Sequence, residues 1–318
     1  MMRRREITIG LVIVALYAVL AVVAPAFFTR ENFGDLFLGN FPVLLVAIGT
    51  TIVILTGEID ISVGSMFAVC GVVAGAAAVA GLPLPVVAAI ACGAGAGLGA
   101  INGALVAYAG LPSIVVTLAT MVVLRDGLRW ATQGAWIQNL PASFQWLGMS
   151  QAAFPIAAAV LVAAVQIALS WSATHVAAFR SLYATGSDPQ AARLAGIDTR
   201  LVRFAALAAG GTLTGLAALL NAVRFNQIPS NAGLGLEMKV VAAVVVGGAA
   251  VRGGRGSFTG TLLGVVLLGS VGPALVFLGI TSYWERAIEG AIVLAAVAAD
   301  AWRMRRPVAI TRRTAGIA

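Results

Sequence analysis

Two carboxylates, Glu58 and Asp60, lie in the stretch LTGEIDISVG (residues 55–64), within a chain in which only 10% of residues are charged. On a helix, residues two apart point in nearly opposite directions, whereas on extended backbone they point the same way. The two carboxylates therefore share a site only if the backbone is unwound. We expect Asp60 or Ser62 to cap the following helix, with a pathway or gating role for Asp60 as the alternative. Glu58 is either a solvated rim charge or a pathway residue.

Other chemistry is limited by what the chain lacks. Its single lysine, Lys239, follows Met238, so the phosphate-binding pattern GxxxxGK[ST] is absent. Its single histidine, His175, excludes an HExxH zinc site and leaves few options for a Ser-His-Asp arrangement. No metal-ligand cluster or activated nucleophile is visible. We therefore expect a protein that is not an enzyme, with no metal and no cofactor of its own.

The composition is that of a membrane protein. Hydrophobic residues make up 60% of the 318 residues, and the mean hydropathy is +1.00, whereas soluble domains carry about 25% charged residues. Apolar windows of about 20 residues, enough to cross a bilayer, recur from end to end. We predict one all-α transmembrane domain over residues 1–318, a bundle of about ten helices. The expected spans are 7–25, 41–57, 62–80, 85–108, 113–131, 152–171, 203–222, 238–251, 258–280 and 285–302.

The arginines predict the orientation. An even number of spans puts both ends on one side, and arginines gather at both ends, which indicates that both termini are cytoplasmic. The terminal arginines are Arg3, Arg4, Arg5, Arg303, Arg305, Arg306, Arg312 and Arg313. This topology places the Glu58–Asp60 turn near the cytoplasmic face. Because the remaining basic residues are scattered over short loops, we expect contact with lipid and no nucleic-acid partner.

A polar segment between two spans, ATGSDPQAARLAGIDTR (residues 184–200), has the pattern of a short helix. Ser187 or Asp188 is a suitable cap, Pro189 suits the first turn, and Gly196 suits the end. A helix of about two turns on the cytoplasmic side suits docking to a soluble partner. The alternative is an amphipathic connector at the membrane surface.

Glycines gather in two regions. In residues 92–110 they recur at the four-residue spacing that lets helices approach closely. The glycines at this spacing are Gly93 and Gly97, together with Gly95 and Gly99. Asn102 in the same segment either lines a pathway or makes an interhelical hydrogen bond. The second region, residues 231–264, includes VRGGRGSFTG, which is typical of a tight cytoplasmic turn with Ser257 as a helix cap.

Four stretches together resemble the permease subunits of sugar-importing ABC transporters of the ribose, xylose, galactose and rhamnose type. They are LTGEIDISVGSM, GSDPQAARLAGI, NAGLGLEMKVVAAVVVGGAAVRGGRGSFTGTLLG and YWERAIEGAIVLAAVAAD. The resemblance implies a multi-pass protein of the bacterial inner membrane, paired with a second copy or a sister permease. It also implies two cytoplasmic ABC ATPase subunits, which bind the ATP, and a periplasmic sugar-binding protein.

The resemblance also assigns residues. Its cytoplasmic coupling loop falls on Asp188, Gln190, Ala191, Ala192, Arg193, Leu194, Ala195 and Gly196. Its glycine-rich signature falls on Gly233, Glu237, Ala242, Ala243, Gly247, Gly248, Gly253, Gly254, Gly256 and Gly260. We expect Gly93, Gly97 and the six glycines from Gly247 to Gly260 to pack helices. Family members commonly have GGID where this chain has GEID, so Glu58 replaces the second glycine.

The sequence thus predicts the permease subunit of an ATP-driven importer for a monosaccharide or related small polar solute, working by alternating access. Candidate pathway or gating residues are Glu58, Asp60, Ser62, Asn102 and Glu237. The rival hypothesis is an ion-coupled secondary transporter that uses Glu58 and Asp60, since such carriers place carboxylates at broken helices. Glu237 and Glu289 are further candidate carboxylates for this hypothesis.

Overall fold

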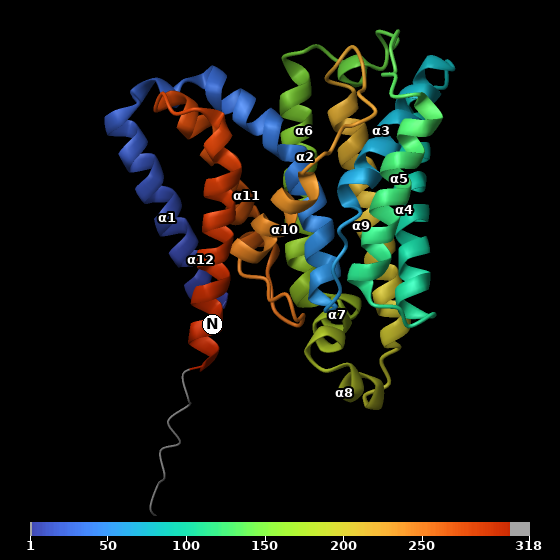
Figure 1. The fold of residues 1–318 in the computed structure, drawn as a ribbon, viewed down its shortest axis with the longest axis vertical. Helices are drawn as coiled ribbons and strands as arrows, with labels where there is room; N and C mark the ends of the chain where they lie inside the picture. Colours follow the sequence, from blue (N-terminus) through green and yellow to red (C-terminus); the bar gives the residue numbers. More distant parts are fainter. Residues whose placement is uncertain (1, 306–318) are drawn as a thin grey trace, which may run out of the picture.

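The structure, a computed structural model, describes residues 2–305 and within that range is a bundle of α-helices (Figure 1). The longer helices are α1 (Met2–Val23), α2 (Arg30–Leu55), α3 (Val63–Val79), α4 (Leu84–Ala107), α5 (Ser113–Thr132), α6 (Ala153–His175), α9 (Thr199–Ala222), α11 (Phe258–Phe277) and α12 (Glu285–Arg305). The shorter ones are α7 (Ala177–Ser187), α8 (Pro189–Leu194) and α10 (Leu236–Val246), with 3-10 turns at Pro25–Phe28, Gln145–Gly148 and Ser282–Trp284. The described part contains no strand, which confirms the all-α prediction.

Helix α2 is the centre of the bundle. Every residue from Phe41 to Leu55 is buried, and the helix packs against α9, α10 and α11. It begins at Arg30, eleven residues before the predicted span, and changes direction in its first half (Figure 1). Pro42, inside the helix, removes a backbone hydrogen bond and so permits a bend. The charged residues before Phe41 explain why hydropathy alone missed this first part.

Helix length gives fewer clear membrane spans than the hydropathy of the sequence does. A helix lies over each of the ten predicted spans, and six helices are long and apolar enough to cross a bilayer: α1, α2, α4, α6, α9 and α11. Helix α10 has 11 residues, about 16 Å, and α3 has 17. Helix α10 is shorter than the roughly 17–25 residues that a simple span needs, and α3 is at the lower limit of that range. The count of about ten therefore stays a prediction.

Helices α4 and α9 pack closely through glycines. A Cβ at Gly95 would overlap the carbonyl oxygen of Gly211, and one at Gly99 would overlap that of Leu207. Gly93 and Gly97 have no atom within 4 Å of a Cβ position, so the prediction that they pack helices within this chain is wrong. Both pairs have the same spacing, but only the pair on the face toward α9 is in contact.

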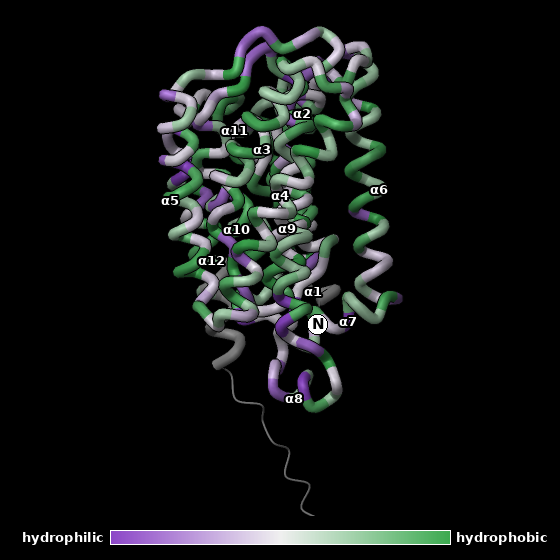
Figure 2. Tube along the Cα trace, turned by 90° about the vertical axis from the view of Figure 1, so that its right-hand side faces the viewer, coloured by the Kyte–Doolittle hydropathy of each residue, from purple (hydrophilic) through white to green (hydrophobic). Residues whose placement is uncertain are grey.

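The two ends of the bundle differ. The beginning of α1, the end of α12 and the short helix α8 all lie at one end (Figure 1), and we refer to this as the α8 end. Hydrophilic segments gather at α8 and at the loops of the opposite end, with mostly hydrophobic chain between them (Figure 2). Of the terminal arginines, Arg306, Arg312 and Arg313 lie outside the described residues.

Candidate functional site

Helix α8 projects from its end of the bundle and is capped as the sequence predicts (Figures 1 and 2). The carboxylate of Asp188 accepts hydrogen bonds from the backbone N–H of Gln190 (2.9 Å) and Ala191 (3.0 Å). Pro189 occupies the first turn. Gly196 follows with a φ of +82°, a left-handed conformation that favours glycine. The local prediction of a short capped helix is confirmed.

The surface of α8 is open to contact. Of the residues matched to the coupling loop, only Ala192 is buried; Leu194 is 92% exposed. An open hollow of about 550 Å³ lies beside α8, between α7 and the beginning of α9, and Arg180, Asp198 and Leu201 contribute to its lining. An exposed leucine beside an exposed arginine and a hollow form a surface on which another protein can dock.

Three chain segments meet next to α8: the end of α2, the end of α7 and the turn after α10. The backbone N–H of Gly254 donates to the carbonyl oxygen of Leu55 at 3.0 Å. A Cβ at Gly186 would overlap that same oxygen, and a Cβ at Gly253 would lie 2.6 Å from the backbone nitrogen of Gly57. We call this contact of Gly57, Gly186, Gly253 and Gly254 the glycine junction, where side chains have no room.

After a turn at Thr56 and Gly57, residues 58–61 have no regular secondary structure and run back into the bundle before α3 begins (Figure 1). The backbone N–H of Ile59 donates to Ser113 Oγ (3.2 Å), at the beginning of α5. Ser62 is bonded to Asn102, which in turn accepts from Thr120 Oγ1 (2.7 Å). Ser113 and Thr120 are seven positions apart on α5, which corresponds to about 10 Å along the helix. The chain from Ile59 to Ser62 therefore runs about 10 Å along α5, away from the glycine junction.

Asp60 belongs to a fully buried polar network. Its Oδ1 accepts hydrogen bonds from the backbone N–H (2.8 Å) and the hydroxyl (2.5 Å) of Ser62. Asn102 Nδ2 donates to Ser62 Oγ at 3.0 Å. Asp60 is 2% exposed, while Ser62 and Asn102 have no exposed surface. Neither Asp60 nor Ser62 accepts a helix N–H as a standard cap; Asp60 instead fixes the residue at which α3 begins. Gly57 lies at the α8 end, next to Gly186 and Gly253, whereas Asp60 lies deeper in the bundle.

Glu58 faces a different helix. Its Oε1 lies 3.1 Å from Nε of Arg203, in the first part of α9, and the two side chains are 11% and 26% exposed. The carboxylates of Glu58 and Asp60 therefore have separate partners, although the backbone between them is not helical. A charge that replaces a family glycine is thus matched by an arginine.

Glu237, at the beginning of α10, lies beside Gly64 in the first turn of α3. Its Oε2 is 3.5 Å from Nη2 of Arg125 on α5. The same carboxylate lies where a Cβ of Gly64 would be, and that Cβ would also lie 2.6 Å from the carbonyl oxygen of Gly233. Gly64 therefore lets α10 and the loop before it approach α3. The three candidate carboxylates do not form one cluster. Glu58 contacts α9, the Asp60 network contacts α4, and Glu237 contacts α5.

The comparisons with known proteins agree with this arrangement. Residues 32–297 match a family model described as the permease component of the branched-chain amino acid transport system. The chain belongs to this permease family. It is 34% identical over 302 residues to the autoinducer 2 import system permease protein LsrC of Photorhabdus luminescens, covering 93% of this chain and 89% of the relative. The corresponding protein of Yersinia enterocolitica is 37% identical over 298 residues (93% and 82%), and that of an Enterobacter species 34% over 314 (98% and 90%).

No solved structure matches this permease. The predicted resemblance to the permease subunits of sugar-type ABC importers is confirmed by its relatives, which are permease subunits of such importers. The permease is thus a multi-pass membrane protein and a transport subunit rather than an enzyme.

The glycines of the family signature make close contacts in this permease. Gly247, directly after α10, packs against Gly260 on α11, each where a Cβ would overlap the carbonyl oxygen of the other. Ser257 caps α11, as predicted, by accepting a hydrogen bond from the backbone N–H of Gly260 at 2.9 Å. Gly256 lies against Ala249 and Leu55. Gly248 has a φ of +98° and lies next to the side chain of Arg5.

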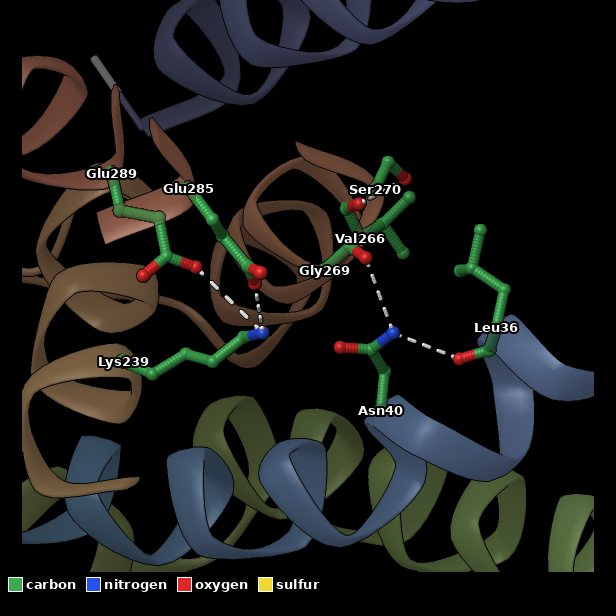
Figure 3. Close-up of polar contacts among 8 residues, drawn as sticks. All are labelled: Leu36, Asn40, Lys239, Val266, Gly269, Ser270, Glu285 and Glu289. Carbon is green, nitrogen blue, oxygen red and sulfur yellow. Dashed lines mark hydrogen bonds and ion pairs between the residues drawn. The ribbon is translucent and has the colours of Figure 1, made fainter. Parts of the chain in front are cut away.

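Sequence reasoning missed one charged cluster. Lys239 Nζ of α10 lies 3.5 Å from Glu285 Oε1 and 3.7 Å from Glu289 Oε1 of α12 (Figure 3). The four-residue spacing of Glu285 and Glu289 puts both on one helix face, which was a usable signal for a shared cation.

Figure 3 also shows a polar contact between α2 and α11. Asn40 Nδ2 of α2 donates to the carbonyl oxygens of Leu36 (2.8 Å) and Gly269 of α11 (3.4 Å).

Proposed function

We propose that this chain is the permease subunit of an ATP-driven importer in the bacterial inner membrane. The observation that supports it best is α8, a capped and exposed helix that projects from the bundle and adjoins the glycine junction. ATP is bound and hydrolysed by separate ABC subunits that dock on α8, since the chain has no phosphate-binding loop of its own. Closing of those subunits moves α8, and the pathway between two permeases opens alternately to each side.

The solute is a small, sugar-like molecule. Autoinducer 2 is the first candidate, because it is the cargo for which the similar permeases are named. A monosaccharide is the second. The remaining partners are a second copy of this chain or a sister permease, and a periplasmic binding protein that delivers the solute.

The proposed topology has ten crossings with both termini in the cytoplasm. Six helices are long and apolar enough to cross the membrane without an added segment. In this topology α3 crosses together with residues 56–62, and α5, α10 and α12 provide the remaining three crossings. The position of the beginning of α1 and the end of α12 at the α8 end supports an even number (Figure 1).

The test is affinity purification of the tagged permease from its host in mild detergent, followed by mass spectrometry. We expect an ATPase with a phosphate-binding loop to stay bound, and Arg193→Glu or Gly196→Val on α8 to release it and to abolish uptake. Arg30→Glu is the matched control, because Arg30 is an exposed arginine at the beginning of α2, at the opposite end of the bundle. Retention of the ATPase and normal uptake in both α8 variants would contradict the proposal.

A further inference from the structure

A cavity of about 480 Å³ lies at the end of the bundle opposite α8. It is open to the outside of the bundle and is bounded by α3, the last turn of α9, the loop after α9 and the loop that follows α5. Its volume is within the range of small-molecule sites. The lining residues used below are Phe67, Gly71, Trp136, Asn221, Asn226 and Gln227.

The walls of this cavity are fixed by backbone hydrogen bonds between distant loops. Ile137 and Ile228 exchange two of them, with N···O distances of 3.0 and 2.9 Å. The backbone N–H of Trp146 donates to the carbonyl oxygen of Val223 at 2.7 Å. A pre-formed site needs less ordering when a ligand binds.

The one charged side chain in the lining is already engaged. Arg224 donates to the carbonyl oxygen of Leu38, and its guanidinium carbon lies 5.8 Å from the ring centre of Phe41 and 5.3 Å from that of Phe225. Arg224 is thereby held against the wall by Leu38, Phe41 and Phe225, and the other polar side chains of the lining, Asn221, Asn226 and Gln227, are neutral amides, which suit a neutral ligand.

The side chains of Asn221, Asn226 and Gln227 have no hydrogen-bond partner among residues 2–305. An amide supplies both donors and an acceptor, which is what a solute with several hydroxyl groups requires. Phe67 and Trp136 add aromatic surface for the C–H groups of such a solute. Three free amides beside aromatic rings fit a neutral cyclic polyol.

The cavity is closed on the side toward α8. Phe67, which is 6% exposed, belongs to its lining. One turn before Phe67, Gly64 contacts Gly233 and Glu237, and below these residues lies the Asp60 network. Within this chain, the contact of α3 with the loop before α10 therefore separates the cavity from the α8 end.

We propose that this cavity holds the neutral, polyhydroxylated solute after the binding protein releases it and before it crosses the membrane, with Asn221 and Gln227 as its hydrogen-bonding residues. This inference rests on the proposed importer function and adds a solute site within the permease itself.

The test uses the complete importer, with ATPase and binding protein, in proteoliposomes, and radiolabelled autoinducer 2 and D-ribose as probes. We expect the double variant Asn221→Ala, Gln227→Ala to lower uptake about tenfold, since two hydrogen bonds to the solute are lost. ATP hydrolysis stimulated by the binding protein should stay within about twofold, because the solute escapes while the cycle continues.

Asn231→Ala is the matched control, since Asn231 is exposed in the same loop and outside the lining. Gly71→Ala is the second variant: it adds a methyl group to the cavity wall without a clash, because its Cβ would lie 3.7 Å from Ile228 Cγ2. We expect it to lower uptake about threefold with unchanged ATP hydrolysis, the added methyl group taking space from the solute.

Unchanged uptake in both variants would overturn the inference. So would a parallel loss of uptake and ATP hydrolysis in both, which would place these residues in the contact with the binding protein. If the wild-type importer itself shows no ATP-dependent uptake of either probe, the proposed function fails instead.

Discussion

The ion pair between Glu58 and Arg203 gives a quantitative prediction. At 3.1 Å and an effective dielectric constant of about 20, the Coulomb attraction is about 5 kcal/mol, but the loss of hydration offsets much of it. Exposed pairs are measured at about 0.2–1 kcal/mol, and loss of one partner from a buried pair costs about 3–5 kcal/mol. With side chains 11% and 26% exposed, this pair lies between these limits.

We therefore expect Glu58→Gln and Arg203→Gln each to lower the free energy of unfolding by about 2 kcal/mol, and the double variant to lower it by about 2.5 kcal/mol. The coupling energy is then about 1.5 kcal/mol, because the second substitution has no partner left to lose. Reversible unfolding in mixed detergent micelles, followed by circular dichroism, measures it. The exposed pair Asp126–Arg129, at 3.9 Å and 68% exposure on both sides, is the control and should couple by less than about 0.5 kcal/mol.

Two results would refute this reasoning. Single effects that add within about 0.5 kcal/mol would show that the pair is not coupled. Loss of uptake in the stable double variant, with docking of the ATPase intact, would show that Glu58 or Arg203 has a transport role beyond their ion pair.

Three further predictions concern α8, the α4–α9 contact and the Asp60 network. Asp188→Ala should weaken binding of the ATPase subunit in co-purification, and Asp188→Ser should restore it, because the cap contributes about 1 kcal/mol to a helix of only six residues. Gly95→Ala should lower the free energy of unfolding by about 1–3 kcal/mol through overpacking against α9. Gly97→Ala, whose added Cβ meets no atom, should raise it by about 0.5–1 kcal/mol. Chemical unfolding of both variants measures the two changes. Asn102→Ala should cost about 2 kcal/mol, because Ser62 and Thr120 each lose a buried partner. Asn32→Ala should cost less in the same assay, because the partly buried Asn32 side chain makes one hydrogen bond, from Nδ2 to the carbonyl oxygen of Phe27 (2.7 Å).

Features encoded by neighbouring residues were predictable from the sequence. The cap at Asp188, the proline after it and the stop at Gly196 act within a few residues of one another, so their pattern gives α8 directly. Ser257 as the cap of α11 is a similar case. The family resemblance, carried by motifs along nearly the whole chain, supplied the importer function that these local patterns do not encode.

Features that depend on which helices meet were not predictable. Gly93 and Gly97 have the same spacing as Gly95 and Gly99, and only the orientation of α4 toward α9 separates the pairs. Lys239 and Glu285 are 46 residues apart, so their contact depends on how α10 and α12 pack. The hydropathy of 238–251 suggested a span, but the helix ends at Val246, followed by Gly247 and by Gly248, whose φ is +98°.

The glycine junction connects the two proposed sites through the chain. Gly186 precedes α8 by only a few residues, and its contact with Leu55 and Gly254 leaves no space for independent movement. If docking moves α8 as proposed, the end of α2 and the turn at Gly57 that follows it have to move as well. From there, a non-helical segment leads within five residues to Ser62, and α3 carries Gly64 and Phe67 at the closed side of the outer cavity. Because the Asp60 network ties this segment to α4 and α5, the same movement has to break or carry that network.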